Sequence, residues 1–580
     1  MGKELFNIQL KEEKKLKRSK WLPAHWKTYN YLEHYPNYME RLSHFSALSA
    51  DLYALTMAQA LMDHDKHDLQ TVFHGYIRKN PFGGEYLLTA GQNIVKEWLD
   101  NWSFDEEDME LLRNKKVQDP ETGAMKPLFS EEFLTMLENA ELELTVEAVP
   151  EGEIAFADQP IYRITGPIWQ AMVVEAFILN VTNSQSLFAT LASRLRETVD
   201  APIMGFSSES GNASLLELGL RRAQTIGGLE VARAGYIGGF DGTSNVMAEK
   251  YYKIPTAGTM AHALIMTYED ELDAFREYAE SMPYNGIFLV DTYDTLQGVK
   301  NAIQACKEKG VKLKGIRLDS GDLATLSKHA RVILDEAGFK EAKIAASNDL
   351  EESTIQEIRE AGGKIDIWGV GTNFVTSKKQ PALGGVYKLG GVYAPEIDGA
   401  QVSKWRDQLE KGQMPSDMDQ HFRDVIKLSE DQIKITLPGA IDTLRFVFNK
   451  GAVNINTPQD AQDGDYIMDV IVNYWKRPQL DDEGRLKEDL VVATKNNPDQ
   501  TITIPKGMKA YRPMEVMTDG GQIITDPETV HEAKARATKS LSRLNKVHKK
   551  IKDAVPYQSF VSKDLLEKRR KEAARRGYKI

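Results

Sequence analysis

The feature that most constrains the fold is an alternation of short β-rich runs with amphipathic helical stretches between about residues 230 and 375. Four runs share this pattern: IFLV (287–290), LKGIRL (313–318), KIAAS (343–347) and KIDIWGV (364–370). The segments between them carry apolar residues at three- and four-residue steps and end near glycine, which is typical of helices. The period is about 27 residues, which predicts βα units in a parallel sheet. We expect a closed or partly closed (βα) barrel, with an open doubly wound sheet as the alternative.

The segments on either side of this repeat have a different character. The first 140 residues mix helical signals with a strand-like run and polar turns, whereas residues 380–530 are rich in Gly, Pro, Asn and Asp with short strand-like runs. We predict five parts: an N-terminal extension (1–45), the first part of an α+β domain (46–200), the barrel (201–378), a mainly β segment (379–530) and a basic helical C-terminal tail (531–580).

Length and composition limit the class of protein. With 580 residues, 42% of them hydrophobic, the chain is expected to form more than one packed unit. Its single cysteine, Cys306, excludes an intrachain disulfide and a cysteine-based zinc site, and fits a reducing compartment. The first 20 residues contain no apolar core typical of a secretory signal. The longest apolar stretch, around Trp169 to Val181, contains Glu175 and is too short to span a membrane. We therefore expect a cytoplasmic protein without membrane spans.

The charge is distributed unevenly along the chain. The net charge is −12, but residues 531–580 contain 16 Lys and Arg against 5 Asp and Glu, so the other residues sum to −23. We interpret the basic tail as a solvated helix that lies on the acidic body, with nucleic acid or an anionic membrane as the alternative partner. An acidic body argues against nucleic acid as the main substrate.

Polar side chains follow each predicted strand at the end that faces the active site in a βα barrel. Five consecutive runs end in such residues: GTMAH (258–262), LVDTYDT (289–295), GIRLDSGDL (315–323), ASNDL (346–350) and WGVGTNF (368–374). A single Asp or Ser after a strand is usually a turn former or the N-cap of a helix. Because five successive ends carry a His, an Arg, several Asp and Asn and a Gly-rich loop, we interpret them as one site.

Several of these residues have a chemical and a purely structural interpretation. Gly371 and Thr372 would form an anion-binding loop at a helix N-terminus, or a tight turn. Arg317 and Asp319 can point to the same side of a strand end, where the Arg suits carboxylate or phosphate and the Asp suits ribose hydroxyls or Mg²⁺. They could also form an ion pair that closes the barrel rim. His262, expected at the end of an apolar strand, would be a core histidine or the acceptor of a transferred group.

The sequence motifs, taken in order, resemble one family. The strings LSADLYALTMAQ (48–59), GLRRAQ (219–224), GGFDGTSN (238–245), GTMAHA, VDTYDT, IRLDSGDL, SNDL and GVGTNF follow one another as in nicotinate phosphoribosyltransferases, as do GGVYKL (384–389) and IKITLPG. The resemblance covers roughly residues 45 to 480. It implies the type II phosphoribosyltransferase fold, an irregular α/β barrel beside a second α+β domain built from both chain ends. It also implies a homodimer with active sites between the subunits.

The resemblance further implies an activity and a set of site residues. Family members combine nicotinate with phosphoribosyl pyrophosphate to give nicotinate mononucleotide and pyrophosphate, the first step of NAD salvage from nicotinate. ATP hydrolysis is coupled through a phosphohistidine, and Mg²⁺ is needed. The matching positions are His262 as phosphate carrier with Thr259 close by, Tyr53 stacked on the pyridine ring from the partner subunit, Arg221 and Arg317 near the carboxylate and phosphates, Asp319 near the ring and ribose, Ser347 and Asn348 at the ribose, and Gly371 and Thr372 at the 5-phosphate.

The nearest rival family is that of the nicotinamide phosphoribosyltransferases. They carry an Asp in the pyridine pocket, where this chain has Ser244. A carboxylate there would repel nicotinate, whereas a hydroxyl would not, so Ser244 favours the acid substrate. A Schiff-base aldolase on a similar barrel would need a Lys at a strand end, and the five ends carry none. A non-catalytic protein on the same scaffold is the third interpretation.

Overall fold

The computed structural model describes residues 45–202, 213–225, 227–431, 434–455, 457, 460–525 and 528–579. The chain divides into two compact units, Met1–Ser46 and Ala47–Ile580, and only the second is described below. The predicted N-terminal extension therefore lies, apart from its last residue, outside the described residues.

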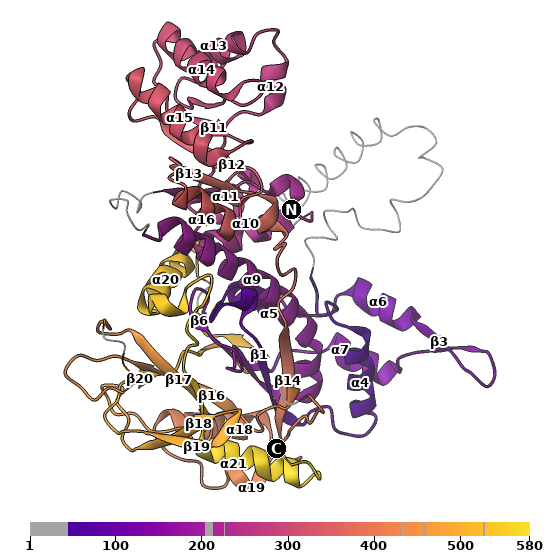
Figure 1. The fold of residues 1–580 in the computed structure, drawn as a ribbon. Coiled ribbons are helices and arrows are strands. Elements are labelled where there is room, and N and C mark those ends of the chain that lie inside the picture. Colours follow the sequence, from indigo (N-terminus) through magenta and orange to yellow (C-terminus); the bar gives the residue numbers. More distant parts are fainter. Residues whose placement is uncertain are drawn as a thin grey trace, which may run out of the picture. The chain divides into compact units, whose positions relative to one another are not determined.

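The predicted barrel is a six-stranded parallel sheet (Figure 1). Its strands are β8 (Ser214–Glu217), β9 (Gly242–Thr243), β10 (Ile287–Leu289), β11 (Gly315–Leu318), β12 (Lys343–Ser347) and β13 (Ile367–Val370). The order in space is β10-β11-β12-β13-β8-β9, so the first strand of the series lies beside the last, with Ser214 opposite Ile367. This cyclic order is that of a barrel and not of a doubly wound sheet. Among the described strands none joins β9 to β10, which leaves the barrel open there. The predicted irregular barrel is confirmed.

A ring of helices follows the strand order. It contains α9 (Glu175–Asp200), α10 (Gly227–Gly238), α11 (Val246–Tyr252), α12 (His262–Met266), α13 (Glu271–Ser281), α14 (Thr295–Lys309), α15 (Leu323–Glu336), α16 (Glu352–Glu360) and α17 (Thr372–Val375). Each of α13 to α16 packs against the next, α16 packs against α9, and α9 packs against α10 (Figure 1). In α14 the side chains of Val299, Ala302, Ile303 and Cys306 are buried, at the predicted helical spacing. Gly310, with φ of 66°, ends this helix.

One local prediction in the barrel is wrong. No strand precedes His262, which is instead the first residue of α12, because residues 257–261 form an extended loop without strand pairing. Arg221 and Arg222 lie in the single turn η3 (Leu220–Arg222). The strand β8 lies within the predicted barrel segment (201–378) but before the repeat that starts near residue 230; β8 and β9 have only four and two residues and carry no visible periodicity.

The second domain combines both ends of the chain, as predicted. Its sheet has the order β15-β14-β1-β7-β5-β21-β22. The strands are β1 (Gln70–Ile77), β5 (Thr145–Ala148), β7 (Tyr162–Pro167), β14 (Gly385–Tyr393), β15 (Phe422–Asp424), β21 (Glu515–Asp519) and β22 (Gln522–Ile523). Around it lie α4 (Leu52–Met62), η2 (Pro81–Gly83), α5 (Gln92–Asp100), α6 (Glu106–Asn114), α7 (Glu131–Glu138), α8 (Ile168–Val173), α18 (Gly399–Glu410) and α19 (Met418–His421), with two small ribbons, β2 (Leu87–Leu88) with β6 (Ile154–Ala155) and β3 (Lys116–Gln118) with β4 (Met125–Pro127).

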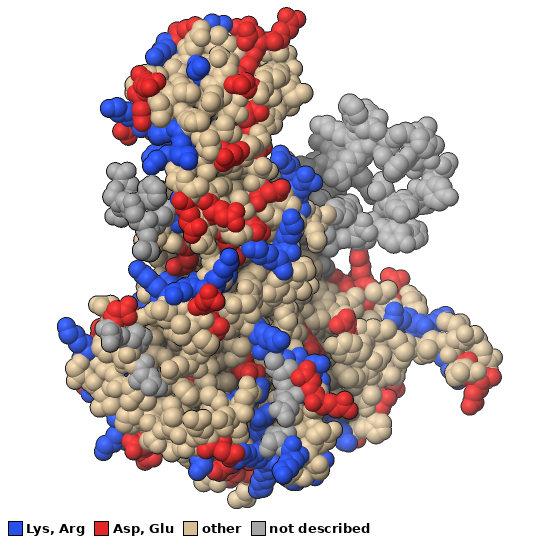
Figure 2. Space-filling model, in the orientation of Figure 1, with Lys and Arg blue, Asp and Glu red and all other residues tan. Residues whose placement is uncertain are grey.

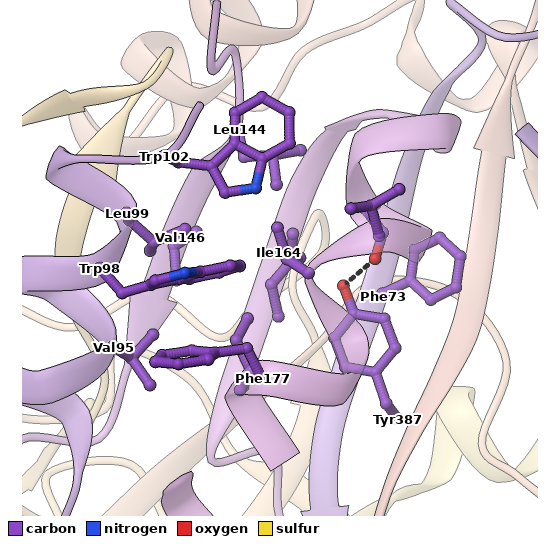
Figure 3. Packing of buried hydrophobic residues seen from close by; sticks show 14 of the residues in the cluster. Phe73, Val95, Trp98, Leu99, Trp102, Leu144, Val146, Ile164, Phe177 and Tyr387 are labelled. Atoms are coloured by element: carbon purple, nitrogen blue, oxygen red, sulfur yellow. Dashed lines mark hydrogen bonds between the residues drawn. The ribbon is translucent and has the colours of Figure 1, made fainter. Parts of the chain in front are cut away.

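The core of this domain is aromatic (Figure 3). Trp98 stacks on Phe177 with ring centroids 4.2 Å apart, and Phe73 stacks on Tyr387 at 5.0 Å. The buried hydroxyl of Tyr387 donates to the carbonyl of Ala171 at 2.7 Å. Offset ring pairs and a satisfied hydroxyl stabilise the junction between the N-terminal helices and the sheet.

A third sheet belongs to the C-terminal part alone. Its order is β19-β18-β23-β17-β16-β20. The strands are β16 (Ile441–Val447), β17 (Tyr466–Asn473), β18 (Leu490–Thr494), β19 (Asn497–Ile504), β20 (Ala510–Tyr511) and β23 (Ser559–Ser562), accompanied by α20 (Val530–Arg543), η5 (Lys546–His548) and α21 (Lys563–Ala574). The tail was predicted as helical, and α20 and α21 are helices. Between them, however, β23 lies inside the sheet, between β17 and β18.

The basic tail pairs with acidic groups of its own chain. Ion pairs join Lys568 to Asp424, Arg570 to Asp499 and Lys549 to Glu197. On the face shown in Figure 2, basic and acidic side chains occur together over the barrel and over the C-terminal sheet. The tail is thus part of the folded body and not a solvated helix on its surface. Of the helices in the described residues, none has the length and apolar character that crossing a membrane requires.

Candidate active site

His262 stands where two strand ends meet. Its Nδ1 lies 3.0 Å from Oγ1 of Thr292, which follows β10, and its Nε2 lies 3.8 Å from Oδ2 of Asp319, which follows β11. The side chain is 40% exposed. In the tautomer in which Nδ1–H donates to Thr292, Nε2 carries the lone pair on the side of the Asp319 carboxylate. The imidazole is therefore placed for chemistry and not enclosed as a core histidine.

Asp319 is tied to the neighbouring strand ends on both sides. Its Oδ1 accepts a hydrogen bond from the buried Ser347 at the end of β12. Its backbone N–H donates to Oδ2 of Asp291 at 2.8 Å, and the hydroxyl of Ser320 donates to the same oxygen at 2.7 Å. The other oxygen of Asp291, Oδ1, is buried and has no hydrogen-bond partner among the described residues. Asp291 and Thr292 were not among the predicted site residues; their position directly after a strand was the available signal.

The Asp residues that follow β10 and β11 fall into two groups: some cap the next helix, and others lie near His262. Asp294 accepts from the backbone N–H of Gln297 and caps α14, and Asp322 accepts from Thr325 and caps α15. The structural interpretation is correct for these two residues. Asp291 and Asp319, each three residues earlier in the chain, point instead toward the group around His262.

Arg317 is half-buried and incompletely hydrogen-bonded. Its Nη1 donates to Oγ1 of Thr259 at 2.7 Å, while its buried Nε has no partner among the described residues. Burial lowers the pKa of Arg317; the charges of Asp319 and Asp291 oppose this effect, and that of Arg221 adds to it. Arg317 thus donates its hydrogen bond to Thr259 and not to Asp319. The alternative interpretation, an Arg317–Asp319 ion pair that closes the barrel rim, does not explain the position of Arg317. An arginine with unused donors suits an incoming carboxylate or phosphate.

The ends of β8 and β9 form a second edge of the site. Ser244 follows β9, is half-buried, and donates its backbone N–H to the carbonyl of Glu217 at 2.9 Å. Arg221 is exposed in η3, and its charge acts on Arg317. Glu217, the buried last residue of β8, was not among the predicted site residues.

The predicted glycine-rich loop follows β13. Thr372 begins α17, and Gly371 precedes it. A Cβ on Gly369 would lie 2.4 Å from Cδ1 of Leu218, so close packing against the loop after β8 requires glycine there. Backbone N–H groups at this helix start suit an anion.

The loop after β12 is strained. Asn348 and Asp349 have φ of 102° and 42°, in the region that non-glycine residues rarely adopt. The side chain of Asn373 donates to the carbonyl of Asp349 at 2.8 Å and so supports this conformation. Strain of this kind persists where the surrounding structure imposes it, often at functional sites. The exposed Asn348 lies next to Ser347, which contacts Asp319.

Tyr53 does not join the group around His262 within the described chain. It lies on α4, which packs against α8 of the second domain, and it is 49% exposed. Its hydroxyl lies 3.5 Å from Oε2 of Glu175. A basic group adjoins this pair: burial lowers the pKa of Lys388, Glu175 opposes the effect, and the charges of Lys427 and Arg78 add to it. Sequence reasoning did not identify this basic group, because its members are far apart in the chain.

Comparison with known proteins gives one consistent family. Three family models match: the nicotinate phosphoribosyltransferase (NAPRTase) N-terminal domain over residues 48–183, the NAPRTase family over 214–436 and the C-terminal domain over 460–569. The chain is 38% identical to nicotinate phosphoribosyltransferase of Bacillus subtilis over 75% of this chain and 79% of that protein. It is 31% identical to the Dictyostelium discoideum enzyme of the same name, over 90% and 87%.

Solved structures agree at the level of the fold. Human nicotinic acid phosphoribosyltransferase matches with a TM-score of 0.67 and 24% identity, over 90% of this chain and 99% of that one. A nicotinate-nucleotide pyrophosphorylase from Pyrococcus furiosus matches with a TM-score of 0.58 and 18% identity, over 88% and 98%.

Proposed function

The chain belongs to the nicotinate phosphoribosyltransferase family, and from this premise we propose that it joins nicotinate to phosphoribosyl pyrophosphate, forming nicotinate mononucleotide and pyrophosphate. The observation that carries the proposal is the convergence of His262, Thr259, Arg317, Asp319 and Ser347 at the carboxyl ends of successive strands. In the cell this reaction would be the first step of NAD salvage from nicotinate, in the cytoplasm.

The reaction breaks the anomeric C–O bond, so positive charge develops on the ribose and negative charge on the leaving pyrophosphate. Arg317, with unused donors, would stabilise the leaving group, and Asp319 would lie near the ribose. The pyridine nitrogen attacks carbon directly, so the protein need only orient the two substrates. Ser347 and Asn348 would contact the ribose, while the N–H groups at Gly371 and Thr372 would bind the 5-phosphate.

Mg²⁺ fits the carboxylates of Asp291 and Asp319. The unpartnered, buried Oδ1 of Asp291 is a free oxygen ligand, and a backbone contact already holds the two residues together. Mg²⁺ prefers a few carboxylates together with substrate phosphates, and when bound it would neutralise pyrophosphate oxygens.

ATP would act through His262. Thr292 holds Nδ1, so the lone pair of Nε2 would attack the γ-phosphorus of ATP, ADP would leave, and water would later release the phosphate. We propose that phosphate on Nε2 tightens the binding of phosphoribosyl pyrophosphate or reshapes the loops around it. Because Nε2 lies 3.8 Å from Oδ2 of Asp319, a phosphate on Nε2 would lie beside the proposed metal ligands.

The pyridine pocket would lie between Ser244, Arg221 and Arg317. The hydroxyl of Ser244 adds no negative charge there, and the arginines offer donors for the nicotinate carboxylate. Tyr53, exposed and outside the group around His262, would stack on the pyridine ring from the second subunit of a homodimer. The basic group near Tyr53 would then meet the same polyphosphate site from the partner side.

The direct test supplies the purified protein with phosphoribosyl pyrophosphate and either nicotinate or nicotinamide, with and without ATP and Mg²⁺. We expect nicotinate mononucleotide, faster with ATP, and little product from nicotinamide. Preferential use of nicotinamide would replace the proposal by the rival phosphoribosyltransferase, and no mononucleotide from either would indicate a non-catalytic protein.

A further inference from the structure

A buried carboxylate at the end of β8 has no basic partner within 4.0 Å among the described residues. Glu217 is 1% exposed. Burial raises its pKa, and hydrogen bonds from Thr243 and Gly219 oppose the effect. Taking a carboxylate out of water is unfavourable unless hydrogen bonds replace the lost hydration. A leucine at the same strand end would avoid this desolvation penalty, so packing alone does not explain an acidic residue at position 217.

The hydrogen bonds of Glu217 join two separate turns. One carboxylate oxygen accepts from the backbone N–H of Gly219, which opens the turn that carries Arg221. The other accepts from Oγ1 of Thr243 at 2.5 Å, and the same Oγ1 accepts from the backbone N–H of Asn245 at 3.0 Å. Ser244 lies between these two residues. One side chain thus fixes the turn before Arg221 and the turn around Ser244.

Close packing around Gly219 makes this arrangement stiff. A Cβ on Gly219 would lie 3.0 Å from Oε1 of Glu217 and 2.3 Å from Cγ1 of Val375 in α17. The adjacent Leu218 donates its N–H to the carbonyl of Val370 at 2.8 Å. The turn is therefore held by the carboxylate on one side and by the loop after β13 on the other, with little room to shift.

Resting on the proposed function, we propose that Glu217 is a positioning residue for the pyridine carboxylate, because it sets the separation of Arg221 from Ser244. Two groups that must contact one small planar anion together need a fixed spacing. Loss of Glu217 would free the two turns to move apart and would weaken nicotinate binding. The residues proposed for phosphoribosyl pyrophosphate, Arg317, Asp319 and Ser347, lie on other strand ends and would keep their contacts.

The test compares steady-state kinetics of the full-length wild type with Glu217→Ala and Glu217→Gln. For Glu217→Ala we expect the KM for nicotinate to rise about tenfold, the scale of one lost charge-assisted hydrogen bond. The KM for phosphoribosyl pyrophosphate should stay within about twofold, which a general loss of structure would not produce. Glu217→Gln keeps the shape and one acceptor oxygen, so we expect a partial rescue, to a rise of about threefold.

Thr243→Val provides a second variant if Glu217→Ala does not fold. It removes the hydroxyl that donates to Glu217 at nearly constant volume, and we expect it to raise the KM for nicotinate and not that for the sugar phosphate. Glu151→Gln is the control for changing a buried carboxylate away from the site: Glu151 is also 1% exposed and accepts a backbone N–H, from Gly91 at 2.6 Å, but unlike Glu217 it pairs with an arginine, Arg233. It should lower stability and leave both KM values unchanged.

The possible outcomes separate this inference from the proposed function. A wild type that forms no nicotinate mononucleotide ends the proposed function and removes the premise of the inference. An active wild type with an unchanged KM for nicotinate in both Glu217→Gln and Thr243→Val overturns the positioning role and leaves the function intact. A parallel rise of both KM values in these variants would also overturn it.

Discussion

Two arginines on strands of different sheets have opposite surroundings. Arg445 on β16 is fully buried and donates to both oxygens of Asp469 at 2.8–3.1 Å, to Oε1 of Glu153 at 2.8 Å and to the carbonyl of Ile154 at 2.8 Å. Burial alone would lower the pKa of Arg445, but Asp469 and Glu153 raise it well above its usual range. Arg317 on β11 has one neutral partner, Thr259, and burial lowers its pKa.

The comparison separates a charge that is fully paired within the fold from one that is proposed to bind a ligand. In the C-terminal sheet all three side-chain nitrogens of Arg445 donate hydrogen bonds, so this cation stabilises the packing of its own strands. At the barrel mouth a donor stays unused and the charge is left partly uncompensated, which reduces stability but keeps the group available to an anionic ligand. The two arginines thus differ in how fully their N–H donors are used within the described residues, although both lie on strands.

The largest effect is expected from Arg445→Met. Removal of the cation leaves Asp469 and Glu153 without their partner in a buried place, so the free energy of unfolding should fall by about 3 to 5 kcal/mol. Chemical denaturation followed by circular dichroism measures it. The double variant Arg445→Met, Asp469→Asn should recover part of the loss. A fall of less than about 1 kcal/mol would mean that Arg445 does not differ from a surface arginine.

Arg317→Met should reduce activity strongly without reducing stability, the opposite of the result expected for Arg445→Met. The kcat/KM should fall by about a hundredfold to a thousandfold, because a preorganised donor toward the leaving group is lost. The free energy of unfolding should stay constant or rise, since an incompletely paired cation is replaced by an apolar side chain. Arg276→Met is the control, because Arg276 pairs with Glu308 on the exposed helices α13 and α14 and should leave activity unchanged. If Arg317→Met lowered the free energy of unfolding as much as Arg445→Met does, the proposed difference between the two arginines would be wrong.

His262→Ala should abolish only the part of turnover that depends on ATP. The imidazole is proposed as a phosphate carrier and not as a group that contacts the anomeric carbon, so turnover without ATP should persist. Rates with and without ATP, together with acid-labile incorporation of labelled γ-phosphate, measure the effect. His421→Ala, which removes an imidazole paired with Glu396 away from the barrel, should leave both the ATP stimulation and the phosphate incorporation unchanged. Unchanged ATP stimulation in His262→Ala would reject the carrier role.

The smallest effect is expected from Ser244→Asp. A new carboxylate in the pocket should repel nicotinate and lower its kcat/KM about tenfold, while nicotinamide should suffer less. Ser244→Asn adds similar volume without charge and should lower the kcat/KM for nicotinate less than Ser244→Asp does. Equal kcat/KM for nicotinate in the Asp variant and the wild type would show that Ser244 lies outside the pyridine pocket.

Local sequence patterns predicted the regular part of the barrel. The strands β10 to β13 and the helices α14 to α16 lie where the alternation placed them, because a helix or strand with one buried face is encoded within its own residues. Strands β8 and β9 were not recognised, since two to four residues carry no period. The strand β23 was missed inside a basic segment, because its place between β17 and β18 depends on distant partners.

The acids of the site show the same limit. In VDTYDT both Asp291 and Asp294 follow a strand, and the sequence marks both equally. Asp294 caps a helix that begins next to it, which is a local event, whereas Asp291 meets the N–H of Asp319 on the neighbouring strand end. Only the pairing of β10 with β11 gives Asp291 its role.

The sequence by itself determined the βα alternation, the ordered motifs of the family and the polar residues at the strand ends. GIRL around Arg317 and TLRF around Arg445 are alike as local sequences, so Arg317 was singled out by the Asp after it and by the family motif and not by its own strand. Tertiary structure determines how their surroundings differ. The antiparallel register of β16 and β17 places Asp469 opposite Arg445, whereas the loop before α12 offers Arg317 only a threonine hydroxyl. Charge compensation depends on neighbours distant in the chain, and so it cannot be read from local sequence.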